Sequence, residues 1–270
     1  MDLKQEIFAP CGSIFDTHAH YDDQCFDECR DELLTELSTH GVGYIINNAT
    51  GLFTSAEKCL EMSRKFDFCY TAVGIHPELV ETEGATVDEQ RFCELIKQPK
   101  VVAVGEIGLD YYWSTDKKEQ QKAVFRRQCE LANEHSLPVI VHDREAHGDT
   151  LDILREIRPK GSVHCFSGSR EMALELVKLG LFIGVGGVVT FKNARKLVEV
   201  VEAIPLESIL LETDAPYLSP VPYRSKTCHS AYIYYTALKV AEIKNISVDE
   251  VLRVTSDNAK RLFNINARGV

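Results

Sequence analysis

The sequence predicts an α/β protein, a single (β/α)8 TIM barrel with one extra helix at its C-terminal end. Eight short apolar runs recur at about the spacing of one βα unit, with helical segments between them. Some runs, such as 101–104 and 139–141, are continuously β-rich, which is typical of parallel strands buried on both faces. Eight such units favour a closed barrel, and a doubly wound open sheet is the alternative. The eight predicted strands cover residues 13–17, 43–47, 68–75, 101–106, 137–142, 161–164, 181–185 and 208–211.

Three helices are the clearest of those predicted between and after the strands. In the segment 117–135 the side chains Val124, Gln128, Leu131 and His135 recur at steps of four and three. A second helix covers 170–179 and ends before Gly180. The last covers 248–263, with Ser247 as its N-cap, and we expect it to pack on the outside of the barrel.

Length and composition fit one globular domain over residues 1–270. A chain of 270 residues allows one or two domains of average size, but parallel barrels commonly use about 250 residues as one domain. No Pro, Gly or Ser linker and no low-complexity tract divides the sequence. With 44% hydrophobic and 26% charged residues, it has the composition of an ordinary globular enzyme or binding protein.

Charge and cysteine usage indicate the compartment and the partners. The net charge of −11 argues against a protein that coats nucleic acid with a basic surface. The nine cysteines are an odd number without a C-x-x-C pair, which suits a reducing compartment. No apolar stretch is long enough to span a bilayer, and nothing near Met1 resembles a secretory signal. We expect a cytoplasmic protein, or a nuclear one in a eukaryote, with no membrane association and no obligate protein partner.

Potential metal ligands follow the predicted strands. His18 and His20 stand at the end of the first strand, where side chains two residues apart point to the same face. The active sites of parallel barrels lie at this end of the strands. The third to sixth predicted strands also lead to a histidine or a carboxylate: His76, Glu106, His142 and His164. Asp214 follows the eighth strand. Each histidine alone could be a core or loop residue, but four imidazoles and two carboxylates gathered without a use would be costly.

This set predicts two divalent ions. Imidazole ligands suit Zn²⁺, Mn²⁺, Co²⁺ or Fe²⁺ better than Mg²⁺, which favours oxygen, although Mg²⁺ stays among the possible ions. Six ligands exceed what one catalytic ion needs, whereas two ions roughly 3.5–4 Å apart would use them all. We expect Glu106 to bridge the ions and Asp214 to hold a metal and act as general base. Both are therefore the predicted catalytic residues; the predicted ligands are His18, His20, Glu106, His142, His164 and Asp214.

The chain resembles the TatD-type metal-dependent deoxyribonucleases. The blocks D-T-H-A-H from Asp16, G-E-I-G-L-D from Gly105, L-P-V-I-V-H from Leu137, H-C-F-S-G from His164 and L-E-T-D-A-P-Y-L from Leu211 look like the motifs of that family, in family order. The resemblance covers about residues 14–263 and implies an amidohydrolase-like barrel with a two-metal site. It further implies hydrolysis of DNA phosphodiester bonds from the 3′ end. Position by position, it assigns His18, His20, Glu106 and Asp214 to one metal, and Glu106, His142 and His164 to the other.

Two segments depart from the family pattern. Family members commonly read His-Pro-His where this chain has His76-Pro77-Glu78, and the usual Arg-Gly-Lys-Arg-Asn-Glu-Pro appears here as residues 224–230, R-S-K-T-C-H-S. His229 thus replaces a carboxylate, while Arg224 and Lys226 remain available for phosphate. The residues we expect to contact substrate are His76, Arg144, Arg224 and Lys226.

Three classes of function are compared. The first is a 3′–5′ exonuclease acting on DNA, with RNA as a further candidate substrate, through a hydroxide activated by two metals. The second is hydrolysis of another ester or amide in the same site, such as an aminoacyl-tRNA ester. The third, a non-catalytic interaction protein, predicts lost ligands, and none is lost. Basic residues near the barrel mouth, including Lys192, favour a phosphate substrate.

Overall fold

A computed structural model describes residues 14–53, 55–82, 87–113 and 116–265. Its strands are β1 (Ile14–Ala19), β2 (Val42–Asn48), β3 (Cys69–Val73), β4 (Val101–Asp110), β5 (Val139–Arg144), β6 (Gly161–Val163), β7 (Phe182–Val185) and β8 (Ile209–Leu211). Its α-helices are α1 (Arg30–Thr39), α2 (Ala56–Lys65), α3 (Glu89–Ile96), α4 (Lys118–Glu134), α5 (His147–Ile157), α6 (Arg170–Lys178), α7 (Arg195–Ala203), α8 (Ile233–Lys244) and α9 (Val248–Phe263).

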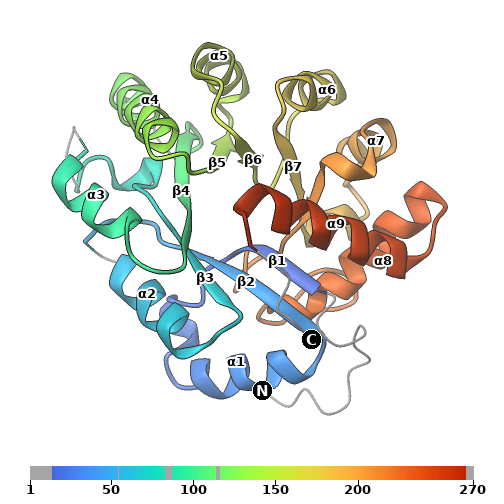
Figure 1. Ribbon diagram of the computed structural model, residues 1–270. Coiled ribbons are helices and arrows are strands. Elements are labelled where there is room, and N and C mark those ends of the chain that lie inside the picture. Colours follow the sequence, from blue (N-terminus) through green and yellow to red (C-terminus); the bar gives the residue numbers. More distant parts are fainter. Residues whose placement is uncertain (1–13, 54, 83–86, 114–115, 266–270) are drawn as a thin grey trace.

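The strands form one parallel sheet in the order β1 to β8, and a helix follows each strand (Figure 1). The segment after β8 closes the ring against β1. There the amide of His20 donates to the carbonyl of Ala215 at 2.7 Å, and the amide of Asp214 donates to the carbonyl of His18 at 2.9 Å. The molecule is therefore the predicted TIM barrel, and the open sheet is excluded.

The extra helix covers one end of the barrel instead of joining the outer ring of helices. Its side chains Ala259 and Phe263 are buried against a cluster of strand residues that includes Phe15 and Leu210. The side-chain amide of Asn258 donates to the carbonyls of Leu206 and Ile209, both at 2.9 Å. These contacts lie at the start of β1 and β8, so α9 closes the N-terminal end and the opposite mouth is left for function (Figure 1).

Most predicted element bounds agree with the structure to within one or two residues. The helix α9 has the predicted bounds, and the Ser247 hydroxyl caps it by accepting from the amide of Glu250 at 3.2 Å. The predicted start of the first strand, Ser13, lies outside the described residues. No helix in the described parts of the chain is long and apolar enough to cross a membrane.

One predicted bound was wrong in a way that concerns function. Strand β4 does not end at Glu106 but continues to Asp110. Its pairing with β5 is irregular between Val104 and Ile107, which oppose Val139 and Val141. Three steps along β4 therefore match two along β5, which is a bulge, and bulges redirect a side chain. Glu106 lies inside this bulge.

Candidate metal centre

The first pair of predicted ligands comes from β1. His18 lies within the strand and His20 directly follows it, and both side chains are buried. As the alternation of side chains along an extended chain predicts, they converge: their Nε2 atoms are 3.1 Å apart. Backbone hydrogen bonds from the segment after β8 hold this end of β1 in place.

Glu106 stands between two pairs of histidines. Its Oε2 lies 3.4 Å from Nε2 of His18 and 3.4 Å from Nε2 of His20. Its Oε1 lies 2.7 Å from Nδ1 of His142 and 2.7 Å from Nε2 of His164. Each oxygen of one carboxylate thus faces its own pair of imidazoles, as a carboxylate shared between two cations would.

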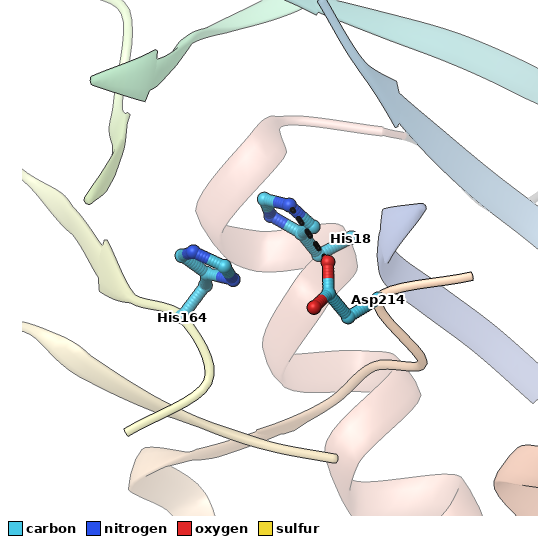
Figure 2. Close-up of side chains that lie close together, drawn as sticks. All are labelled: His18, His164 and Asp214. Atoms are coloured by element: carbon cyan, nitrogen blue, oxygen red, sulfur yellow. Dashed lines mark ion pairs between the residues drawn. The ribbon is translucent and has the colours of Figure 1, made fainter. Parts of the chain in front are cut away.

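Asp214 completes the side of the centre formed by β1. It lies three residues beyond β8, with a left-handed backbone (φ 64°) that aspartate adopts more readily than most residues. Its Oδ1 is 3.4 Å from Nε2 of His20 and 3.8 Å from Nε2 of His18. The rings of His18 and His164 stack at 3.8 Å between centroids, so the two sides of the centre are in contact (Figure 2).

These separations fit divalent cations. Ligand atoms on a tetrahedral zinc, with bonds of about 2.0–2.1 Å, lie about 3.3 Å apart. The ligand atoms of His18, His20, Glu106 and Asp214 that approach one another are 3.1 to 3.8 Å apart. In the part of the chain that the structure describes, three groups of residues have ligand atoms that all lie within 4.8 Å of one another: His18–His164–Asp214, His18–His20–Glu106 and His76–Glu106–His142.

Hydrogen bonds to the outer ring nitrogens orient two of the histidines. Nδ1 of His20 lies 2.9 Å from the carbonyl oxygen of Asn48, which can only accept, so Nδ1 carries a hydrogen and, in the neutral ring, Nε2 is the nitrogen that can offer a lone pair to a metal. Nε2 of His142 lies 3.1 Å from Oδ2 of Asp110. This contact leaves Nδ1 of His142 to face Glu106, an arrangement typical of metal-bound histidines.

The centre keeps its carboxylates ionised. Burial alone would raise the pKa of Glu106, but the neighbouring histidines, above all the charge of His164 together with the hydrogen bond from His142, hold it well below its usual range. Burial also opposes ionisation of Asp214, whose pKa is nevertheless lowered by the hydrogen bond and charge of His20. Buried carboxylates that stay negative attract cations.

The histidines respond in opposite directions to the same surroundings. Burial, with His164 close by, lowers the pKa of His18 to about 3, so its ring is neutral and free to bind a metal. Burial also disfavours the charged forms of His20 and His142. The carboxylates that face these two histidines outweigh the effect of burial, however, and raise the pKa of His20 to about 9 and that of His142 to about 10. The cavity thus favours positive charge at these two positions.

Asp16 supports the centre from beneath. Its carboxylate is fully buried and accepts from the amide and hydroxyl of Thr213 at 3.0 and 2.7 Å, and from the hydroxyl of Ser230 at 2.7 Å. Burial raises the pKa of Asp16 to about 6 in spite of these donors. Asp16 therefore ties β1, which positions His18 and the following His20, to the segment that holds Asp214.

Among the described residues, side chains at this end of the barrel line two neighbouring cavities. The first, which we name the metal cavity, has a volume of about 370 Å³ and is lined by ligands together with His76, Glu78 and Tyr217. The second, the side cavity, has a volume of about 950 Å³ and extends toward α7. His142, His164 and Asp214 line both, so the side cavity is continuous with the metal cavity.

The four predicted substrate residues fall into two groups. His76 lines the metal cavity, with Nε2 3.5 Å from Oε1 of Glu106, and Arg144 lines the side cavity. Arg224 and Lys226 line neither of these cavities. The Arg224 guanidinium lies 3.6 Å from the centroid of the Phe191 ring, and the Lys226 ammonium 4.9 Å from that of Tyr223.

Sequence reasoning missed three buried residues that support the ligands. Asp110 contacts His142, and alternation along β4 from Glu106 could have identified it. Asn48 acts through its backbone, which leaves no signal in the sequence. Glu212 accepts from the amide of Cys165 beside His164; burial raises the pKa of its carboxyl to about 7.

Comparisons with known proteins agree with this geometry. Residues 15–264 match the family described as TatD related DNase. The chain is 41% identical over 257 residues to the uncharacterized metal-dependent hydrolase YabD of Bacillus subtilis, covering 94% of this chain and all of that protein. It is 36% identical to YcfH of Escherichia coli, another uncharacterized metal-dependent hydrolase, over 94% of this chain and 97% of that protein. The crystal structure of YjjV, a TatD homolog of Escherichia coli, superimposes with a TM-score of 0.87 at 32% identity, covering 95% of this chain and all of that one. The chain therefore belongs to the TatD-related DNase family of metal-dependent hydrolases.

Proposed function

We propose that this hydrolase cleaves phosphodiester bonds in DNA, removing nucleotides from the 3′ end, with two divalent ions held by the six clustered ligands. The observation that best supports two ions is the position of the Glu106 carboxylate. One of its oxygens lies 2.7 Å from the nitrogens of one histidine pair, and the other lies 3.4 Å from those of a second pair. The family description supports DNA as substrate. Arg144, Arg195 and Lys196 line the side cavity and supply positive charge for a polyanion, although the whole chain carries −11.

Bound divalent ions supply Lewis acidity at a phosphoryl oxygen and lower the pKa of a water molecule. Asp214, ionised and lining both cavities, accepts the proton of the attacking water. His76 has a different role. Its Nδ1 accepts from the amide of Glu78 at 3.3 Å, so its hydrogen is on Nε2, where it donates to a phosphoryl oxygen near Glu106.

The substrate class is tested with purified protein loaded separately with Zn²⁺, Mn²⁺, Co²⁺ or Mg²⁺. The substrates are strands of DNA and RNA with a labelled 3′ nucleotide, a DNA duplex, a small neutral ester and an amide. We expect release of the 3′-labelled mononucleotide from DNA, and no release by metal-loaded Asp214→Asn prepared in parallel. Turnover of the ester or amide without turnover of DNA would instead establish the second class of function.

A further inference from the structure

An exposed aromatic pair stands at the mouth of the barrel beside the metal centre. Tyr112 and Trp113 directly follow the end of β4, with 56% and 67% of their surface exposed. Their rings meet edge to face at 4.8 Å between centroids. Large aromatic side chains left this exposed mark a contact surface when a binding cavity lies beside them.

The pair is held in position by Asp110, which also contacts a ligand of the metal centre, and by Arg144. Oδ1 of Asp110 accepts from the amide of Tyr112 at 2.9 Å, while Oδ2 of the same carboxylate contacts His142. The guanidinium of Arg144, two residues beyond His142, lies 3.9 Å from the centroid of the Tyr112 ring and 5.5 Å from that of Trp113. The aromatic pair therefore has a fixed place relative to the ligands.

Trp113 and Arg144 line the side cavity together with His142, His164 and Asp214. The walls of this cavity also include apolar side chains such as Phe166, Val188 and Leu197, and its volume of about 950 Å³ lies near the upper end of the range for ligand-binding cavities. A flat aromatic face, a guanidinium and apolar walls next to a phosphate-cleaving centre match the chemistry of a nucleobase attached to a phosphate. A small amide or ester would need neither the aromatic face nor the cation.

We propose that Trp113, steadied by Arg144, is the stacking platform for the base next to the scissile phosphate, so that the side cavity is a nucleoside subsite. This inference rests on the proposed function, because it assumes a nucleic-acid substrate. Stacking on an aromatic side chain accepts every base, since each has a π face, and Arg144 is placed to contact a neighbouring phosphate. The platform gives the enzyme a requirement for a base without a preference among bases.

The first test uses fluorescence, because Trp113 is the one tryptophan of the chain. Metal-loaded Asp214→Asn protein is titrated with an oligothymidylate and with a strand of equal length whose 3′ nucleotides are abasic tetrahydrofuran residues. We expect saturable quenching of tryptophan fluorescence by the first strand and much weaker quenching by the second. Binding of the oligothymidylate, followed by anisotropy of a label on the strand, without any change in tryptophan fluorescence would overturn the proposal.

The second test is kinetic. Trp113→Ala should raise KM for the oligothymidylate about tenfold and leave cleavage of the abasic strand unchanged, whereas Trp113→Phe should stay near wild type. Phe53→Ala is the control: it removes another aromatic side chain, which is 60% exposed and lines neither cavity, and it should leave KM unchanged for both strands. An unchanged KM in Trp113→Ala, or an equal loss on both strands, would refute the platform. Failure of the wild-type protein to cleave any DNA would refute the proposed function itself.

Discussion

Each histidine of the centre can bind a metal only through a nitrogen that carries no hydrogen. Nδ1 of His20 is committed to the carbonyl of Asn48, and Nε2 of His142 faces the carboxylate of Asp110. The two rings thus present opposite nitrogens to Glu106, a choice that their outer partners fix and that their positions in the sequence do not reveal.

Replacing Asp110 tests this orientation. Asp110→Asn keeps the size of the side chain but removes its charge, so it should weaken metal affinity about 10–100-fold with little change in fold. Competition with a chromophoric chelator measures the affinity. Asp149→Asn, which alters a carboxylate paired with the hydroxyl of Tyr111, is the matched control and should bind metal like wild type. Equal affinities in all three proteins would remove Asp110 from the centre.

Replacing Asp214 should reduce turnover more than replacing His76. Asp214→Asn keeps an oxygen donor but cannot accept a proton, so kcat should fall about 10²–10⁴-fold while much of the metal stays bound. His76→Ala removes a hydrogen-bond donor and should cost less. Steady-state kinetics on a labelled DNA strand, with bound metal quantified in each sample, measures both. Similar mild losses in the two variants would show that Asp214 does not move the proton.

Among the elements, the short strand β8 depends on the segment that follows it. The barrel closes through the backbone of His18, His20, Asp214 and Ala215, and Asp16 binds that segment from below through Thr213. The positions of these residues just beyond two strands predict that they meet, but not that the closure itself runs through them.

Thr213→Val tests the closure. It removes a buried hydroxyl that donates to Asp16 at 2.7 Å and accepts from the amide of Ala215 at 3.1 Å. The unfolding free energy should fall by about 1–3 kcal/mol, because Asp16 loses a donor inside the protein. Urea unfolding measures the change. Thr35→Val, which removes an exposed hydroxyl on α1, should cost clearly less, and equal costs would contradict a special role for the closure.

The segment 224–230 that departs from the family pattern is an element built around a buried histidine. His229 packs against Tyr232 at 3.8 Å between ring centroids, and burial lowers its pKa to about 3. The unfolded chain, with an ordinary pKa near 6.5, binds this proton more readily than the folded protein. Above about pH 6.5 His229 therefore does not change the free energy of unfolding with pH. As the pH falls toward 3, the free energy of unfolding decreases progressively because the unfolded chain binds the proton.

His229→Gln removes this titration and leaves the other groups in place. Between pH 6.5 and 5 the unfolding free energy of wild type should fall by about 2 kcal/mol more than that of the variant. Urea unfolding at the two pH values measures the difference, in which the contributions of all other groups cancel. Parallel pH dependences in the two proteins would show that His229 does not remain neutral in the fold.

For the whole molecule, the fold and the six clustered side chains were predictable because both follow from periodicity. Parallel strands of a barrel end at one mouth, so ligand residues at successive strand ends must meet. The bulge that turns Glu106 inward, the backbone carbonyl of Asn48 and the cover formed by α9 were not predictable, since they depend on pairing registers and backbone atoms. Phosphate contact by Arg224 and Lys226 stays a prediction; the sequence could not show that the two side chains also lie over the rings of Phe191 and Tyr223.

The central claim is that Glu106 joins two metal sites in one hydrolytic centre. Elemental analysis of the purified, metal-reconstituted protein, with DNA hydrolysis assayed on the same samples, tests it most directly. Glu134→Gln alters a surface carboxylate of α4 and serves as control. The account predicts about two ions per chain in wild type and control, with activity lost on chelation, and loss of both metal and activity in Glu106→Gln. A Glu106→Gln protein that retains both ions, or a metal-free wild type that retains full activity, would contradict it.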